Sequence, residues 1–438
     1  MIDLIKKRIL DFREEGVPEF RKRDFKVTFV KNMVTTLVGV RKAGKTYLTY
    51  QVIDEELASG TIEGMDQVCY LHFDDEALLG FTVQDMEKIE QSLLEINPDF
   101  FEKPCLLIFD EIHKVAKWEH YILRLLRKKH TRILVTGSSS ELEEDKVDRQ
   151  LRGKAFHLKV FPLSFKEFVQ WHGFEYSGNA LSTKDSIQLK KLFENFLQEG
   201  GFPGVFEVTT HRDKINLLQS YYRSIVTSDF IEAIGGANLL AVKAFLKRLM
   251  QGNASHYFHT KTFNSLKSAG IPVTKALVSD WYHQAEACYF LKSNAVYALS
   301  QSKIAQNPRI PYVVDWAMAN AISHPLELKR TRALETIVFY DLIRACMGVS
   351  YYRSTDRHQA EIDFIAYHHF EEPTFAIQVS YDVSNPDTLA REIRAFSSLE
   401  GTKNKNMQRI LLTLTPKSEI KTPANIQVMN PIEWLLRE

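Results

Sequence analysis

Cysteine and long apolar runs are both scarce in this sequence of 438 residues. The four cysteines lie far apart and form no CxxC pair, so we expect neither a disulfide framework nor a zinc site of that type. No apolar run approaches the roughly 18 residues that a membrane-spanning helix needs, and the first residues lack the apolar core of a signal peptide. We therefore expect a cytoplasmic protein that has no membrane partner.

A dominant charge is absent as well. The 56 Lys and Arg residues nearly balance the 55 Asp and Glu residues, which leaves a formal net charge of +1. No field of the whole chain would attract nucleic acid, so any nucleic-acid surface has to be a local patch. With 45% hydrophobic and 25% charged residues the composition is that of a globular protein, which excludes a disordered chain. At roughly 150 residues per domain, the length predicts about three domains.

The strongest motif is a phosphate-binding loop. Gly39 to Thr46 reads GVRKAGKT, which fits the pattern GxxxxGK[ST], and it follows the apolar, β-rich run Thr35 to Val38. In such a loop backbone N–H groups surround the phosphates, Lys45 reaches the β and γ oxygens, and the Thr46 hydroxyl binds Mg²⁺. We therefore predict ATP and Mg²⁺ as cofactors and a helix that begins at Lys45. The predicted nucleotide contacts are Gly39, Val40, Arg41, Lys42, Ala43, Gly44, Lys45, Thr46 and Tyr47.

A second motif follows some 65 residues later, where the apolar strand Cys105 to Asp110 ends in two acids. Asp110 is expected to bind Mg²⁺ together with Thr46, and Glu111 to orient or deprotonate the attacking water. An acidic pair that merely caps a strand is the alternative, and the preceding phosphate-binding loop argues against it. We predict Asp110, Glu111 and Lys45 as catalytic residues of an ATPase.

Two further strands complete the predicted sheet. The strand Arg132 to Thr136 ends in hydroxyl residues, so either Thr136 or Ser138 is a candidate for a catalytic polar residue that reaches the γ-phosphate or the water. The other strand, Gln67 to Asp74, lies between the two motifs in the sequence. Together with Glu111 directly after Asp110, it indicates the hydrolytic, additional-strand branch of P-loop ATPases.

The remainder of the chain changes in pattern. Helical periodicity from Ile187 to about Lys247 predicts a helical subdomain. Helices over Phe263 to Ala269 and Thr274 to Ala287, followed by two strands at Tyr289 to Lys292 and Val296 to Leu299, predict a winged helix-turn-helix. Its second helix has few basic residues, so DNA reading and protein packing both remain open.

Taken together, these motifs resemble those of prokaryotic AAA+-superfamily ATPases that have an uncharacterised C-terminal domain. The last two phrases of the set are specific to that family. The set is GVRKAGKT (39–46), LHFDD (71–75), DEIHK (110–114), TGSS (136–139), LRGK (151–154), PLSFKEF (162–168) and GGFP (200–203). In the family an arginine commonly follows the glycine of the LRGK phrase, where this chain has Lys154. Lysine cannot make the bidentate contact of an arginine finger, which leaves Arg149 and Arg152 as substitutes.

The resemblance also implies a C-terminal restriction-endonuclease fold. Glu335 matches the helical acid of such sites and Asp363 the strand acid, but the expected Glu-x-Lys reads Gln378-Val379-Ser380. A carboxylate and a lysine are thus replaced by an amide and a hydroxyl, and we expect nuclease activity to be absent. In the alternative, Glu361 fills the missing role and the protein is an ATP-regulated, metal-dependent DNA nuclease.

We therefore expect an α/β protein of four parts. These are an AAA+-type P-loop ATPase core with a parallel sheet (1–170), a helical lid subdomain (171–250), a winged helix-turn-helix-like domain (251–310) and a restriction-endonuclease-like domain (311–438). The predicted function is Mg²⁺-dependent ATP hydrolysis that couples the nucleotide state to binding of DNA or a protein partner. The intact Glu111 argues against a scaffold that uses nucleotide only for structure.

Overall fold

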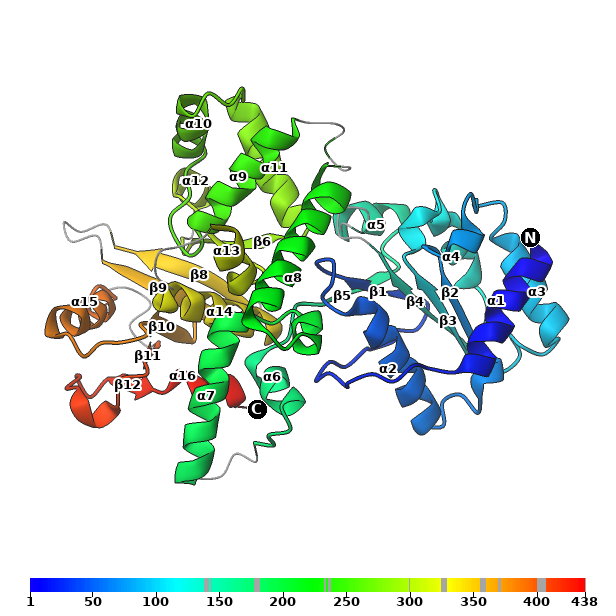
Figure 1. The fold of residues 1–438 in the computed structure, drawn as a ribbon, viewed down its shortest axis with the longest axis horizontal. Helices are drawn as coiled ribbons and strands as arrows, with labels where there is room; N and C mark the ends of the chain where they lie inside the picture. The colour runs from blue at the N-terminus through cyan, green and yellow to red at the C-terminus, as the bar shows by residue number, and fades with distance from the viewer. Residues whose placement is uncertain are drawn as a thin grey trace. The chain divides into compact units, whose positions relative to one another are not determined.

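The computed structural model describes the chain except for residues 138–141, 143, 177–181, 232–233, 235–237, 299, 324–328, 355–359, 369–371, 400–406 and 438. It divides into two compact units, one of residues 1–161 with 287–289 and one of residues 162–286 with 290–438. Each unit has its own β-sheet (Figure 1). The first unit ends before the expected boundary at residue 170, and the three predicted C-terminal domains share the second unit.

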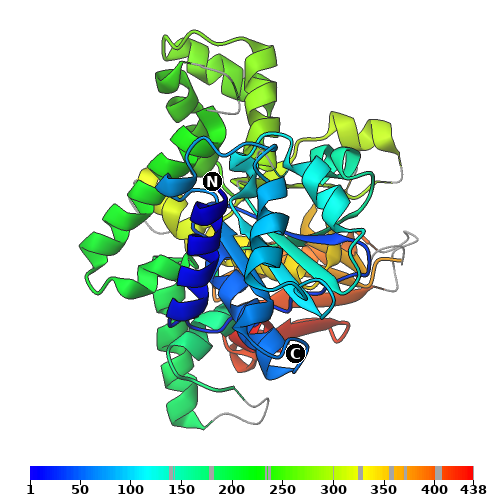
Figure 2. The same ribbon diagram turned by 90° about the vertical axis from the view of Figure 1, so that its right-hand side faces the viewer.

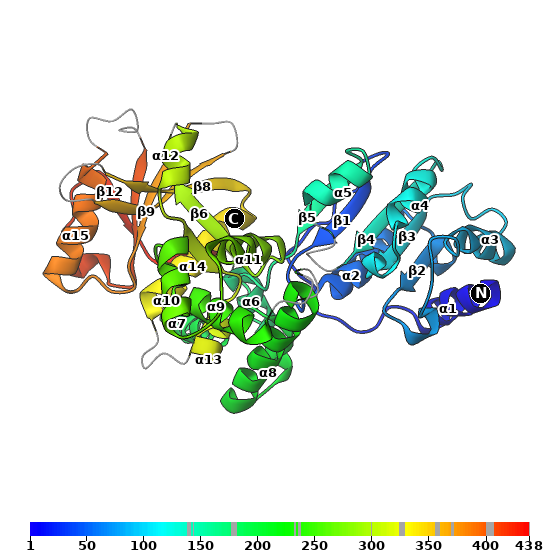
Figure 3. The same cartoon turned by 90° about the horizontal axis from the view of Figure 1, so that it is seen from above.

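The first unit is built on a parallel five-stranded sheet in the order β2-β3-β4-β1-β5. Its strands are β1 (Val34–Val38), β2 (Val68–His72), β3 (Cys105–Asp110), β4 (Thr131–Thr136) and β5 (Ala155–Lys159). Its helices are α1 (Ile2–Glu15), α2 (Lys45–Ala58), α3 (Glu87–Ile96), α4 (Trp118–Leu125) and α5 (Glu144–Gln150), with short 3-10 helices η1 (Met65–Gln67), η2 (Glu76–Leu78) and η3 (Ile112–Lys114). α1 packs against α3 and β2, which Figures 2 and 3 show from two directions.

All four strands predicted for this unit are present, with ends that differ by one or two residues. Every residue of β1 and β3 is buried, as expected for strands that are covered on both faces. The strand that lies between β1 and β3 is β4, whereas β2 is at the edge of the sheet. β4 therefore separates the two motif-bearing strands, while the predicted strand at Gln67 to Asp74 is present as β2.

The second unit contains a mixed seven-stranded sheet in the order β12-β11-β10-β9-β8-β6-β7. Its strands are β6 (Leu291–Val296), β7 (Ile310–Val313), β8 (Met347–Arg353), β9 (Glu361–His368), β10 (Phe375–Val379), β11 (Gln408–Leu412) and β12 (Ile426–Met429). β9 is antiparallel to both of its neighbours, while β10, β11 and β12 are parallel.

Helices make up much of the same unit (Figure 1). They are α6 (Phe165–Trp171), α7 (Thr183–Glu199), η4 (Pro203–Glu207), α8 (His211–Ser224), the π-helix η5 (Ile225–Ile231), α9 (Leu239–Gln251), α10 (His259–Ser268), α11 (Lys275–Ala287), α12 (Gln301–Gln306), α13 (Trp316–Ser323), α14 (Arg330–Arg344), α15 (Pro386–Ser397), η6 (Lys417–Glu419) and α16 (Pro431–Leu436). Among the described residues no helix combines the length and the apolar character that crossing a membrane requires.

The two helices predicted for the helix-turn-helix are present as α10 and α11, but the predicted pair of wing strands is wrong. A single strand, β6, runs through residues 293–295, which separated the two predicted strands. β6 pairs with β7 on one side and with β8 on the other, so its backbone is satisfied within the large sheet. Because both neighbours lie later in the sequence, local periodicity did not reveal this pairing.

The two phrases that carry the family resemblance meet inside the second unit. The backbone N–H of Leu163 donates to Gly201 O over 2.7 Å, and the N–H of Gly201 donates to Asp315 Oδ2 over 2.8 Å. Gly200 has φ +77°, and a Cβ there would lie 2.5 Å from Asp315 Oδ2, so only glycine fits. This junction places PLSFKEF in the second unit and explains why the first ends at Phe161.

Candidate functional site

The phosphate-binding loop connects the end of β1 to the start of α2. Gly39, Lys42 and Gly44 all have positive φ, which gives the loop its tight curl. A Cβ at Gly39 would lie 2.1 Å from the carbonyl oxygen of Val160, next to β5. Glycine at position 39 is thus required both by its φ of +151° and by the close approach of backbone.

Lys45 begins α2, as predicted, and its side chain closes over the loop. Its Nζ donates to Gly39 O over 2.9 Å and to Val40 O over 3.2 Å, and the residue is 7% exposed. The other predicted contacts differ in exposure: Val40 and Ala43 are fully buried, Arg41, Gly44 and Thr46 half-buried, and Lys42 and Tyr47 exposed. Phosphate oxygens that take the place of the two carbonyls would meet a cation already positioned among backbone amides.

Arg23 supports this loop, which the sequence did not reveal. Its guanidinium is buried and donates from Nη1 to Ala43 O over 2.9 Å and to Phe161 O over 3.0 Å. Its backbone N–H donates to Gln51 Oε1 on α2 over 2.8 Å, which fixes the segment before β1 against that helix. A lone arginine in a polar stretch has no recognisable signal in one sequence.

Asp110 lies at the carboxyl end of β3 and is fully buried. Its Oδ2 accepts a hydrogen bond of 3.0 Å from the Tyr70 hydroxyl on β2, and its Oδ1 accepts one from the Thr136 hydroxyl on β4. His72 Nε2 lies 3.8 Å from Oδ2. Burial, followed by the nearby Asp110 carboxylate, raises the pKa of Tyr70, so the tyrosine remains a neutral donor. Three strands thus hold one carboxylate in a fixed orientation.

Glu111 follows in the left-handed conformation, with φ 56°. Its backbone N–H donates to Thr136 Oγ1 over 3.1 Å, and its Oε2 lies 3.3 Å from His113 Nδ1. Burial raises the pKa of the Glu111 carboxyl, and the charges of Lys45 and Arg41 oppose that rise. A carboxyl with a raised pKa is a better proton acceptor for water than an ordinary surface carboxylate. Ser138 lies outside the described residues, whereas Thr136 contacts both acids.

The residues present fit a nucleotide with Mg²⁺. A loop of backbone amides, the Lys45 ammonium group and the hard oxygens of Thr46 and Asp110 are the donors that phosphate and Mg²⁺ prefer. The Thr136 hydroxyl bridges Asp110 to the backbone of Glu111, so a displacement of one acid would also change the position of the other. The predicted site residues of the first unit are therefore brought together at the carboxyl ends of β1 and β3.

The second unit contains a separate cluster of acids around the predicted nuclease positions. Glu335 on α14 accepts a hydrogen bond of 2.6 Å from the Tyr312 hydroxyl. Asp363 on β9 accepts one of 2.7 Å from the backbone N–H of Val379. Burial and the neighbouring acids raise the pKa of both carboxyls, which favours their protonated forms. Protonated carboxyls are poor ligands for Mg²⁺.

A third acid in this cluster, Glu392 on α15, was missed because it is far in sequence from the expected motif. Gln378 Nε2 donates to Glu392 Oε2 over 2.5 Å, and Arg391 Nη2 donates to Oε1 of the same acid over 2.6 Å. Glu361, the residue of the nuclease alternative, has Oε2 3.0 Å from His256 Nε2. Among the described residues no group of three His, Cys, Asp or Glu side chains has a geometry suited to a metal ion.

The other polar residues that the sequence suggested for a site do not lie together in one place. On α15, Arg391 pairs with Glu392 and Arg394 is exposed. Ser380 is buried and donates to Asp382 O over 3.2 Å. Arg149, considered for a finger, donates from Nε to Asp145 O over 3.0 Å.

Comparison with known proteins agrees with the geometry of the first unit. Residues 31–169 match the model of a family described as an AAA domain. An uncharacterised protein of Methanocaldococcus jannaschii is 27% identical over 403 residues, which cover 89% of this chain and 84% of that protein. An uncharacterised protein of Haemophilus influenzae is 25% identical over 421 residues, 96% of each chain. A solved Walker-type ATPase of Pyrococcus abyssi aligns with a TM-score of 0.46 and 12% identity over 72% of this chain and 94% of its own. The match to an AAA domain over residues 31–169 agrees with the phosphate-binding loop at Gly39 to Thr46 and supports nucleotide binding there.

Proposed function

We propose that the protein is an Mg²⁺-dependent ATPase whose nucleotide state controls the binding of a partner, DNA or protein, by its second unit. The observation that carries this proposal is the position of Glu111, buried beside Asp110 and close to Lys45 at the end of β3. A site that used nucleotide only for structure would need no carboxyl with a raised pKa at this position.

Each group has a distinct role in the proposed reaction. Lys45 and the loop amides hold the β- and γ-phosphates, while Thr46 and Asp110 would hold Mg²⁺, which neutralises charge on the phosphate oxygens. Glu111 accepts the proton of the attacking water as the new O–P bond forms and the bond between the γ-phosphorus and the bridging oxygen breaks, with ADP as the leaving group. The Thr136 hydroxyl holds both acids in position through its hydrogen bonds to Asp110 and to the backbone of Glu111.

Two variants test the site. Lys45→Ala is expected to abolish ATP binding in calorimetry, whereas Lys103→Ala, which removes an exposed lysine 3.4 Å from Glu63, should bind as the unaltered protein does. Glu111→Gln is expected to bind ATP normally and to hydrolyse it at least a hundredfold more slowly, because the amide cannot accept the proton. Normal turnover by Glu111→Gln would remove this residue from the mechanism.

The acid cluster of the second unit supports a structural role better than phosphodiester cleavage. Each acid already accepts a hydrogen bond from a neighbouring group, and Gln378 stands where a metal ligand would be required. Incubation with plasmid DNA and Mg²⁺ or Mn²⁺ tests this assignment. Cleavage that disappears in Asp363→Ala would contradict it.

A further inference from the structure

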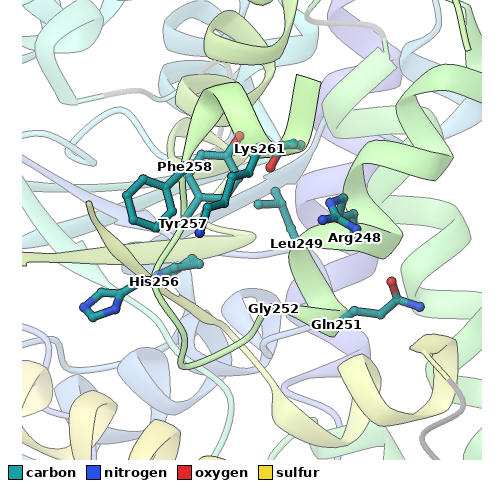
Figure 4. Close-up of a pocket in the computed structure, with 10 residues that line it drawn as sticks. Arg248, Leu249, Gln251, Gly252, His256, Tyr257, Phe258 and Lys261 are labelled. Atoms are coloured by element: carbon teal, nitrogen blue, oxygen red, sulfur yellow. The ribbon is translucent and has the colours of Figure 1, made fainter. Parts of the chain in front are cut away.

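A cavity of about 220 Å³ lies where the end of α9, the following loop and the start of α10 meet (Figure 4). The loop is fixed from both sides. Tyr257 N–H donates to Arg309 O over 2.7 Å, and the Tyr257 ring stacks on Tyr282 of α11 with centroids 4.3 Å apart. The cavity is therefore part of the helix-turn-helix rather than a gap in a loose surface.

The cavity is lined by cations and by no acid. Arg248 and Lys261 contribute side chains from α9 and α10. Neither cation pairs with a carboxylate in the described part of the chain, and Lys261 Nζ lies over the ring of Phe258, 4.4 Å from its centroid. Two exposed positive groups thus line one small space, where the nearby Glu361 carboxylate pairs with His256 and not with either of them.

The cavity also has polar donors that lack partners. α10 begins after Phe258, whose side chain cannot cap the helix, and its first turn contains no acidic residue. The free N–H groups of that turn give the positive end of a helix dipole. The hydroxyl of Tyr257, a residue only 9% exposed, makes no hydrogen bond of good geometry in the described structure, and the nearby Thr262 hydroxyl, which also lines the cavity, is its one weak partner among the described residues. Burial raises the pKa of Tyr257 to about 12, so the hydroxyl stays protonated and can donate to an anion.

The surrounding sequence extends this positive charge beyond the cavity. Residues 233–279 contain no Asp or Glu, although the chain as a whole is nearly neutral. The same stretch has six exposed basic residues: Lys243, Lys247, Arg248, Lys261, Lys267 and Lys275. A free phosphate ion needs only the cavity, whereas a charged polymer uses both the cavity and a row of cations around it.

We propose that this cavity binds a backbone phosphate of duplex DNA, held by Arg248, Lys261 and the Tyr257 hydroxyl at the start of α10. The site anchors the helix-turn-helix on the sugar-phosphate backbone and reads no base. DNA binding here requires no ATP hydrolysis, so the proposal can fail or succeed independently of the ATPase assignment.

The test measures binding of a fluorescein-labelled 30-base-pair duplex to the full chain by anisotropy, without nucleotide, across a series of KCl concentrations. Arg248→Ala combined with Lys261→Ala is expected to weaken binding by at least tenfold and to reduce the slope of log Kd against log [KCl] by about one, because one phosphate contact is lost. The matched control, Lys190→Ala combined with Lys191→Ala, removes the same charge from exposed positions of α7 outside the acid-free stretch, and should change Kd by less than threefold. Equal losses in the two double variants would overturn the proposal.

Tyr257→Phe separates the cavity from general electrostatics, since it removes no charge. We expect it to weaken duplex binding severalfold while the melting temperature changes little, because the hydroxyl makes no hydrogen bond of good geometry and has only the weak contact with Thr262 to lose. Unchanged affinity in Tyr257→Phe would remove the hydroxyl from the site. Calorimetry with inorganic phosphate gives the last arm: phosphate binding that is lost in Arg248→Ala with Lys261→Ala, while duplex binding is retained, would assign the cavity to a free phosphate instead.

Discussion

Replacing Thr136 by valine is the sharpest test of how the two acids are held. The hydroxyl of Thr136 donates to Asp110 and accepts from the backbone N–H of Glu111, and valine keeps the shape of the side chain while it removes both interactions. A hydrogen bond to a charged group contributes about 1.5–3 kcal/mol. Since about 1.4 kcal/mol corresponds to a tenfold change in rate, we expect kcat for ATP to fall by about ten- to a hundredfold.

The binding of ATP itself should be little affected, because the hydrogen bonds of the Thr136 hydroxyl in the described structure go to Asp110 and Glu111 and not to the phosphate-binding loop. We therefore expect the Kd for ATP in calorimetry to change by less than threefold. Thr136→Ser is the matched control: it keeps the hydroxyl, loses one methyl group, and should retain most of the turnover. If valine and serine lower kcat equally, or if valine leaves it unchanged, the hydroxyl bridge does not position the acids.

Three further predictions concern buried groups. Burial raises the pKa of Asp315 from 3.8 to about 6, so the folded state binds the proton more tightly than the unfolded state does. The free energy of unfolding therefore falls by up to about 3 kcal/mol as the pH rises from about 4 to 6. Urea titrations at several pH values should show that Asp315→Asn lacks this fall. Glu335→Gln should raise the midpoint of urea unfolding at pH 8 and change it little at pH 5, because burial of Glu335 disfavours only its charged form. An equal shift of the midpoint at both pH values would show that burial of this charge is not the reason. Gly39→Ala should abolish ATP binding in calorimetry, because its Cβ would overlap Val160 O at 2.1 Å, and normal binding would contradict the loop geometry.

The first unit was largely predictable because its signals are local. The order strand, glycine-rich loop and helix at Gly39 to Thr46 is dictated by phosphate chemistry, and an apolar strand that ends in Asp110 and Glu111 has few other uses. The strand order needed the structure, since β4 lies beside β1 although it is distant in sequence. Arg23 and Tyr70 were missed because their partners are backbone carbonyls and a carboxylate that only folding brings near.

The second unit was predicted less well because its sheet is assembled from distant segments. β6 looked like two short strands, since the partners that satisfy its polar middle come from β7 and β8. Glu392 reaches the acid cluster from a helix that follows the expected motif, so motif spacing could not reveal it. The cavity beside α10 could not be predicted because its lining comes from α9, α10 and Pro311, although the absence of acids from residues 233–279 is visible in the sequence.

The Arg23 guanidinium connects the phosphate-binding loop to the end of the first unit. One Nη1 atom ties the carbonyl of Ala43, within the phosphate-binding loop, to the carbonyl of Phe161, the last residue before the chain enters the second unit. A displacement of the Ala43 carbonyl would therefore change a contact that Arg23 also makes at residue 161, where the chain passes from the first unit to the second.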